Sequence, residues 1–131
     1  AQKEAAIGFI GSLNYVPSIN TAENKAFIKA YKDKFGRAPS EFAVQGYDSG
    51  KVIIKAIESL SGNIKDKDKL AEAISSVSII GPRGPLTIDP RTNNVIQNIY
   101  IFEVVNGDQG PELKVLDTIE AVKSPGEGCN L

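Results

Sequence analysis

The polar stretch at residues 11–18, GSLNYVPS, holds side chains that could contact a small molecule. Asn14 and Tyr15 follow an apolar segment that we expect to form a strand. In α/β folds, ligands bind in the crevice beyond the carboxyl ends of strands. Asn14 and Tyr15 are therefore candidate ligand-binding residues, and the alternative that this stretch is only a turn with a surface tyrosine stays open.

A second group of candidates begins the segment 41–60, EFAVQGYDSGKVIIKAIESL. At helical spacing, Phe42, Gln45 and Gly46 share one face, which combines an aromatic ring, an amide and a gap without a side chain. Such a face suits a small organic molecule. A glycine in a helix interior costs ~1 kcal/mol relative to alanine, so Gly46 and Gly50 raise the question of what approaches this helix so closely. The alternative places Phe42 in the core and Gly46 beneath a crossing helix.

Other classes of chemistry lack the residues that they need. The sequence has no histidine, which removes Ser-His-Asp and Cys-His catalysis and His-ligated zinc. Its single cysteine, Cys129, cannot form an intrachain disulfide or a cysteine-cluster metal site. The sequence contains no phosphate-binding glycine motif, no paired carboxylates and no Asp-rich calcium loop. We predict no catalytic residues, no metal and no cofactor, so the protein is not expected to be an enzyme.

Arg83 lies between two rigid breaks in the stretch GPRGP, residues 81–85. A guanidinium held there could bind a carboxylate through two parallel hydrogen bonds. We favour the simpler interpretation, in which the stretch is a fixed bend that carries an exposed arginine.

The overall composition is that of an ordinary globular domain. The chain has 131 residues, which is enough for one domain with a hydrophobic core. Of these residues, 41% are hydrophobic and 24% are charged. The net charge of -1 gives no field that would attract nucleic acid or an anionic membrane, and the basic residues do not cluster with aromatic ones. No apolar run is long enough to span a bilayer. We therefore expect no nucleic-acid partner.

Hydrophobic periodicity predicts the elements that must position the candidate residues. A short apolar segment at residues 6–12 is expected to be a buried strand, followed by a loop. Three helices should come next, capped by Asn20, Ser40 and Asp66, with Gly36 ending the first. The second helix is apolar over so wide an arc that it should pack on more than one side.

From residue 78 onward the pattern changes to strands and turns, with alternating segments at residues 86–89 and 95–105 and a further strand at 112–122. The order is thus a strand, three helices and an antiparallel strand group, a mixed α/β fold. A lone first strand is a poor partner for three amphipathic helices. Because the chain also opens on AQKEAA without an initiator methionine, we expect a processed chain or a fragment.

Two phrases of the sequence resemble the late part of type I periplasmic binding proteins, the solute receptors of ABC transporters for branched-chain amino acids, amides and aromatic acids. The first phrase is FIKAYKDKFGRAPSEFAVQGYDSGKVIIKAI, residues 27–57. It carries the pattern F…Y…(Y/F)G…P…A…GYD…A(I/L) in Phe27, Tyr31, Phe35, Gly36, Pro39, Ala43, Gly46, Tyr47, Asp48, Ala56 and Ile57. The second phrase, GPRGPLTIDPRTNNVIQNIYIFEV, is similar to a Gly-Pro-containing strand, an Asp-Pro turn and a following strand of that family.

The resemblance implies a fold of two α/β lobes joined by crossover strands, with a ligand trapped between the lobes. Residues 1–123 would be the C-terminal part of such a receptor, the second half of one lobe plus the hinge strands, and residues 124–131 a tail. Phe42 matches a ligand-contacting position, with Gln45 and Gly46 beside it, and Tyr15 would lie in a loop that borders the cleft. Gly46 and Gly50 would leave room for the ligand or for an adjoining strand.

The implied function is that of the extracytoplasmic solute-binding component of an ABC importer. Its ligand would be a small carboxylate such as a branched-chain amino acid, an amide or an aromatic acid. Its partner would be the membrane permease, and its location periplasmic or extracellular, with a lipid anchor as one form of attachment. The alternatives are a ligand-sensing module of the same fold, a small interaction domain without a ligand, and a fragment that folds only as a homodimer or swapped assembly.

Overall fold

The computed structural model describes residues 3–108 and 110–126, which form one antiparallel sheet and three α-helices. A 3₁₀-helix at Lys3–Ala6 precedes β1 (Ile10–Leu13), and the helices α1 (Ala22–Phe35), α2 (Glu41–Ser59) and α3 (Lys67–Ser75) follow. Strands β2 (Ser78–Gly81), β3 (Gly84–Ile88), β4 (Val95–Gly107) and β5 (Gly110–Val122) complete the order. The predicted order of a strand, three helices and an antiparallel strand group is confirmed.

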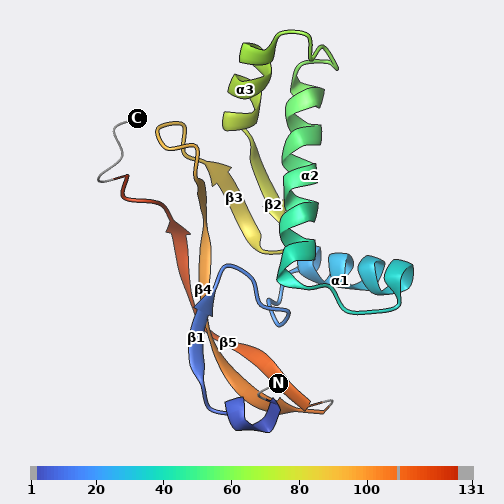
Figure 1. Ribbon diagram of the computed structural model, residues 1–131, viewed down its shortest axis with the longest axis vertical. Coiled ribbons are helices and arrows are strands. Elements are labelled where there is room, and N and C mark those ends of the chain that lie inside the picture. Colours follow the sequence, from blue (N-terminus) through green and yellow to red (C-terminus); the bar gives the residue numbers. More distant parts are fainter. Residues whose placement is uncertain (1–2, 109, 127–131) are drawn as a thin grey trace.

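The long strand β4 holds the sheet together (Figure 1). Its residues 97–107 pair with β5 along one edge. β1 pairs with residues 100–103 and β3 with residues 95–97, both along the opposite edge, and β2 extends the sheet from β3. Figure 1 shows α2 and α3 beside β2 and β3, and the first part of β4 alongside β3. The ribbon formed by β1, the rest of β4 and β5 extends away from α2 and α3. β4 is therefore the element that connects the helical half of the molecule to the ribbon of β1 and β5.

Local capping signals set most helix ends where the sequence predicts them. The Ser40 hydroxyl accepts the Ala43 N–H at 3.3 Å at the start of α2, and Asp66 Oδ1 accepts the Lys69 N–H at 3.1 Å at the start of α3. Gly36 ends α1 with φ 67°, a left-handed conformation that glycine adopts without a Cβ penalty.

The cap of α1 differs from the prediction by one residue. Thr21, not Asn20, begins the helix, because its hydroxyl accepts the Asn24 N–H at 3.2 Å. The Asn24 side chain is itself buried and donates to the carbonyls of Pro17 and Ile19. Asn24 thereby holds the preceding loop against α1, which selects Thr21 as the cap.

Two clusters of buried apolar side chains form the core. The first joins the loop after β1 to α1, α2 and β4, and consists of Tyr15, Val16, Ile19, Phe27, Val44 and Tyr100. The second joins the later part of α2 to β2 and β3, and consists of Val52, Ala56, Val77, Ile79 and Leu86. α2 contributes to both clusters, so it is the helix that binds the two together.

The first strand is shorter and more exposed than predicted. The expected buried strand at residues 6–12 is wrong: β1 begins at Ile10, and both Phe9 and Ile10 are exposed. β1 pairs only with β4, so its outer edge has no neighbour among the described residues. Residues 124–126 have no regular structure, and the rest of the predicted tail, including Cys129, lies outside the described residues.

Candidate functional site

The start of α2 presents an exposed face on which three candidate residues lie. Phe42 is 73% exposed, Gly46 is exposed, and Gln45 is half-buried at the edge of this face. Ile53 lies two turns further along and is also exposed. Successive helix residues are turned by roughly 100°, so Phe42, Gly46 and Ile53 form one strip along α2. We call these three residues the outer strip.

Among the described residues, the start of the outer strip is open, whereas Ile53 is 49% exposed and also lines a cavity with Asp48 and Arg83. A Cβ added at Gly46 or Gly50 would meet no atom within 4 Å. The alternative in which Phe42 lies in the core and Gly46 lies beneath a crossing helix is therefore wrong. The wide apolar arc of α2 is buried at Val44, Val52 and Ala56. Beside this buried face, Ala43 packs against the first core cluster and the ring centroid of Tyr47 lies 4.8 Å from that of Phe27.

The other two candidates lie on the opposite side of α2. Tyr15 is 2% exposed and packs in the same core cluster as Val44, so the alternative of a surface tyrosine is wrong. Its hydroxyl donates to Asn24 Oδ1 at 3.0 Å, and burial raises the pKa of Tyr15 to about 12. Asn14 is half-buried beside it. The structure thus gathers Phe42, Gln45 and Gly46 but does not bring Tyr15 to the outer strip.

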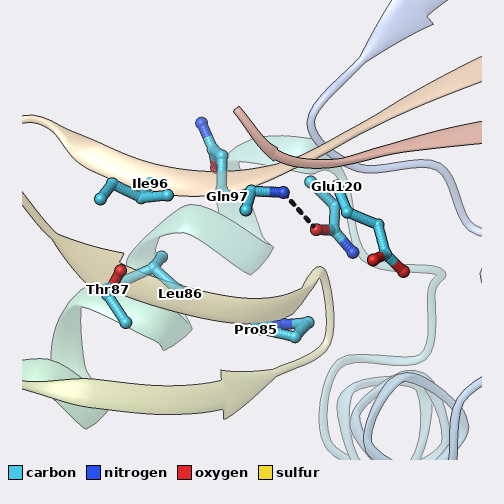
Figure 2. A pocket seen from close by; sticks show the side chains of 8 residues that line it. Pro85, Leu86, Thr87, Ile96, Gln97 and Glu120 are labelled. Carbon is cyan, nitrogen blue, oxygen red and sulfur yellow. Dashed lines mark hydrogen bonds between the residues drawn. The ribbon is translucent and has the colours of Figure 1, made fainter. Parts of the chain in front are cut away.

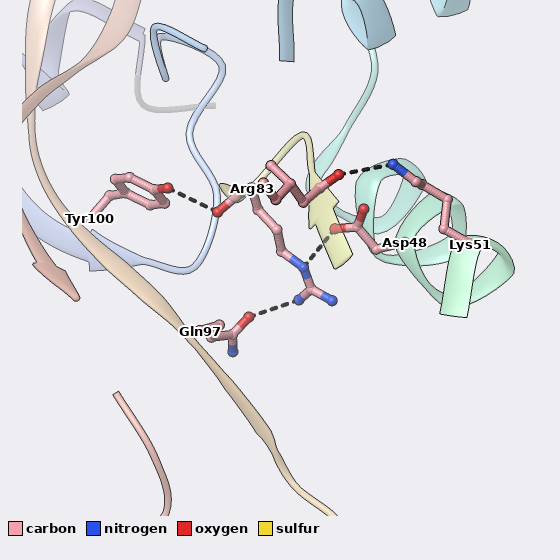
Figure 3. A network of polar contacts seen from close by, with 6 residues as sticks. Asp48, Lys51, Arg83, Gln97 and Tyr100 are labelled. Carbon is pink, nitrogen blue, oxygen red and sulfur yellow. Dashed lines mark hydrogen bonds and ion pairs between the residues drawn. The ribbon is translucent and has the colours of Figure 1, made fainter. Parts of the chain in front are cut away.

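Beneath α2 lies a buried polar network that the sequence analysis did not predict (Figure 3). Arg83 Nε donates to Asp48 Oδ2 at 2.8 Å, and Arg83 Nη1 donates to Gln97 Oε1 at 2.9 Å. The Tyr100 hydroxyl donates to the Arg83 carbonyl at 2.8 Å. Arg83 is only 7% exposed, so the predicted exposed arginine is wrong. The network joins α2, the β2–β3 turn and β4.

The two glycines that flank Arg83 make room for this network. A Cβ on Gly81 would lie 2.0 Å from Asp48 Oδ1, which no side chain could tolerate. Gly84 has φ 92°, and a Cβ there would lie 2.9 Å from the Tyr100 hydroxyl. Gly81 therefore allows the carboxylate to approach the turn, and Gly84 supplies the left-handed conformation that the turn requires.

Asp48 is a buried carboxylate whose hydrogen-bonding capacity is only partly satisfied. Its side chain is fully buried, and Oδ1 has no hydrogen-bond partner. Burial raises the pKa of Asp48, and the nearby Arg83 and Lys51 charges oppose that shift. Lys51 itself donates to the Ile80 carbonyl at 2.9 Å. Burial thus disfavours the ionised form of Asp48, and the Arg83 guanidinium is the cation bonded to it.

The sequence does contain a signal for this network. Asp48 lies four residues after Val44 and four before Val52, in the middle of the buried face of α2. A charged residue at such a position requires a partner, since ionised groups are rarely buried alone. Arg83, fixed between two breaks, was the available cation, but the pair is separated by 35 residues and no local pattern connects them.

Two cavities lie close to these residues. One of about 180 Å³ runs beneath α2, and its lining comprises Asp48, Ser49, Val52, Ile53, Arg83, Leu86, Ile88 and Val95. The other, of about 240 Å³, lies where β3, β4 and β5 meet (Figure 2). There the Ala121 N–H donates to Asn98 Oδ1 at 3.2 Å, and Ala121 has φ 50° at an irregularity in the β4–β5 pairing. The first cavity has an apolar lining beside the Asp48–Arg83 pair, and the second has a more polar one.

The described residues offer neither a metal centre nor a membrane span. Within residues 3–108 and 110–126, no group of three or more acidic, histidine or cysteine side chains could hold a metal ion. No helix in this part of the chain is long and apolar enough to cross a membrane.

Comparisons with known proteins place the chain among solute receptors. A family model described as periplasmic binding protein matches residues 1–109. The Leu/Ile/Val-binding protein homolog 6 of Brucella abortus is 35% identical over 127 residues, which are 94% of this chain and 32% of that protein. The chain therefore spans about a third of the length of the curated relatives that it matches.

Solved structures give the same result. A solute binding protein of an ABC transporter from Rhodopseudomonas palustris BisB5, in complex with 3,4-dihydroxybenzoic acid, superposes with a TM-score of 0.88 at 36% identity, over 94% of this chain and 34% of that one. Another from R. palustris, in complex with benzoate, has a TM-score of 0.84 at 30% identity, over 98% of this chain and 34% of that one. The predicted type I periplasmic-binding-protein fold is confirmed.

Proposed function

The chain belongs to the periplasmic binding protein family, and on that premise we propose that it is part of the extracytoplasmic solute-binding component of an ABC importer. Residues 1–123 would supply the second half of one lobe together with the hinge strands, and residues 124–131 a tail. The whole receptor would close two lobes around its ligand and would make or break no covalent bond. Its partner would be the membrane permease, and its location periplasmic or extracellular, with a lipid anchor as one form of attachment.

The observation that carries the proposal is the uncovered start of α2. Phe42 projects a largely exposed aromatic ring, and the open space over Gly46 lets a planar molecule approach the helix backbone. The Gln45 amide lies at the edge of the same face and can both donate and accept hydrogen bonds. A ring to stack on, a gap and one amide together suit a small ligand with an apolar or aromatic body.

Tyr15 and Asn14 take a supporting role in this proposal. Because the Tyr15 hydroxyl is already bonded to Asn24 and its ring is buried, we assign Tyr15 to fixing the loop after β1 rather than to direct ligand contact. Asn14, which is half-buried in that loop, is assigned to the border of the ligand cleft.

The ligand would be a small carboxylate, for which two classes deserve testing. The relatives in complex with 3,4-dihydroxybenzoic acid and with benzoate support an aromatic acid, and the exposed ring of Phe42 agrees with that class. The relative named for leucine, isoleucine and valine supports an aliphatic amino acid. We favour the aromatic acid, because stacking on Phe42 needs a flat partner.

The test is a calorimetric titration of the full-length protein with benzoate, 3,4-dihydroxybenzoate and leucine. We expect one benzoate-class ligand to bind, and Phe42→Ala to weaken its binding by about tenfold or more, a loss of ~1.4 kcal/mol. Phe35→Ala is the matched control, since Phe35 is 53% exposed but lies at the far end of α1. Absence of binding to all three compounds would contradict the ligand class, and equal affinity of Phe42→Ala and wild type would contradict the site.

A further inference from the structure

The Asp48–Arg83 pair combines features that set it apart from the apolar contacts of α2. Val44, Val52 and Ala56 pack against the core through dispersion contacts, which tolerate small rotations of the helix. The bond from Arg83 Nε to Asp48 Oδ2, at 2.8 Å, is directional and charge-assisted. Among the described contacts, it is the buried ion pair that ties α2 to the sheet.

The pair also reaches across the molecule to β4. Arg83 is held from two further sides, because Nη1 donates to Gln97 and its carbonyl accepts the Tyr100 hydroxyl. Figure 3 shows these residues arranged in a row from α2 to β4 through the β2–β3 turn. Two hydrogen bonds hold the guanidinium and a third holds the Arg83 backbone, so Asp48 is anchored to a group with little freedom.

As a source of stability the arrangement is poor. Asp48 Oδ1 is buried without a partner, and two glycines are needed to let the network form. Well-packed apolar residues in place of a buried ion pair are often as stable or more so. What the pair supplies beyond an apolar contact is a fixed rotation of α2 about its own axis.

Rotation matters because the outer strip lies on the other side of the same helix. Counting from Asp48, Phe42, Gly46 and Ile53 are turned by roughly 120–160° around the axis. At a radius of about 5–6 Å, a rotation of roughly 10° would move a side chain by about 1 Å. A gap of that size already removes about a quarter to a half of a van der Waals contact.

We propose that Asp48 and Arg83 are positioning residues, which fix the rotation of α2 and thereby aim the outer strip at the ligand. The inference rests on the proposed function for its effect on affinity. Neither residue contacts the ligand; each acts through the orientation of Phe42 and Gln45.

The test separates orientation from stability by exchanging the pair for apolar residues of similar shape. We expect the double variant Asp48→Leu/Arg83→Met of the full-length protein to unfold in urea at a midpoint equal to or above that of the wild type. We expect the same variant to bind benzoate, or whichever titrated compound the wild type binds, about tenfold more weakly. The matched control is Lys29→Met/Asp33→Leu, which removes an exposed ion pair of α1.

Wild-type affinity in a stable double variant would overturn the proposal. If the double variant does not fold, Arg83→Lys decides, because lysine keeps the charge but cannot hold Asp48 and Gln97 at once. Arg83→Lys should also bind about tenfold more weakly, and unchanged affinity would again overturn the positioning role.

A second measurement does not depend on the ligand. A 4-fluorophenylalanine at position 42 should give one ¹⁹F resonance in the ligand-free wild type, and a shifted or broadened resonance in the pair variants but not in the α1 control. If the wild type binds none of the three compounds, the proposed ligand class fails and this spectrum alone decides the positioning role. Identical spectra in the wild type and the pair variants would refute it.

Discussion

The two faces of α2 differ in whether their side chains have partners among the described residues. The inner face carries Val44, Asp48 and Val52, each with a packing or hydrogen-bonding partner. The outer strip carries Phe42, Gly46 and Ile53, which touch solvent. The inner face is therefore committed to the fold, and the outer strip is available to a partner. One helix thus divides into a face committed to the fold and a face that we propose binds the ligand.

The two faces of α2 also differ from the usual amphipathic helix in where charged and apolar side chains lie. The inner face contains a buried carboxylate and the outer one contains exposed apolar side chains. A fold-only helix would show the reverse arrangement, with apolar residues inside and charges outside. Val44, Val52 and Ala56 follow that pattern, whereas the buried Asp48 and the exposed apolar side chains of the outer strip depart from it.

The largest loss of stability should come from removing the partner of Asp48 on the inner face of α2. Arg83→Met leaves the Asp48 carboxylate buried with no cation bonded to it, and removing one partner of a buried pair costs about 3–5 kcal/mol of unfolding free energy. Urea denaturation at neutral pH measures this loss. The exposed Lys29–Asp33 pair is the control, for which Lys29→Met should cost no more than about 1 kcal/mol. A comparable loss for the two variants would show that burial of the Asp48 pair is unimportant.

Lowering the pH should restore part of the unfolding free energy that Arg83→Met loses, because the Asp48 carboxylate becomes protonated. Burial raises the pKa of Asp48 above its ordinary 3.8, and Arg83 lowers it, so removal of Arg83 should raise it further. A carboxyl whose folded-state pKa is raised is tolerated below its unfolded pKa and becomes costly as the pH rises through the folded-state value. The stability difference between Arg83→Met and wild type should therefore grow as the pH rises through the interval between the raised folded-state pKa of Asp48 in the wild type and its still higher value in the variant. A difference that stays constant with pH would assign the loss to packing alone.

The same substitution, glycine to alanine, can be made on both sides of α2: at Gly81, which contacts the inner face, and at Gly46 in the outer strip. Gly81→Ala places a methyl group 2.0 Å from Asp48 Oδ1, and such overpacking costs about 1–3 kcal/mol. Gly46→Ala meets open space within α2, so it should stabilise the fold by up to ~1 kcal/mol. Thermal unfolding of both variants tests the pair. Destabilisation by Gly46→Ala would show that something besides the described residues already covers the outer strip.

Local signals in the sequence predicted most of the elements. Ser40, Asp66 and Gly36 act where they were expected, because a cap depends on residues within one turn. The alternation at residues 95–105 identified β4 for the same reason. The order of elements followed from these local patterns, and the family resemblance followed from the two sequence phrases that begin at Phe27 and Gly81.

Contacts between distant residues were not predictable in the same way. The Asp48–Arg83 pair spans 35 residues, and nothing near Arg83 indicates that it is buried. The burial of Tyr15 was not predicted, because its partner, Asn24, belongs to the next helix. Phe42, Gln45 and Gly46 were grouped correctly, since helical spacing alone puts them on one face. The wide apolar arc of α2, however, concealed which part of it faces the core.

The smallest loss of stability should come from removing a side chain of the outer strip. Phe42 is a larger residue than the buried Val44, but its truncation should cost less. Phe42→Ala removes an aromatic ring that is mostly in water and should change the unfolding free energy by no more than about 0.5 kcal/mol. Val44→Ala removes only two methyl groups from a fully buried position and should cost about 2 kcal/mol. Urea denaturation of both variants makes the comparison. If Phe42→Ala costs more than Val44→Ala, the ring of Phe42 is packed against something in the folded protein, and the division of α2 into a fold face and a binding face is wrong.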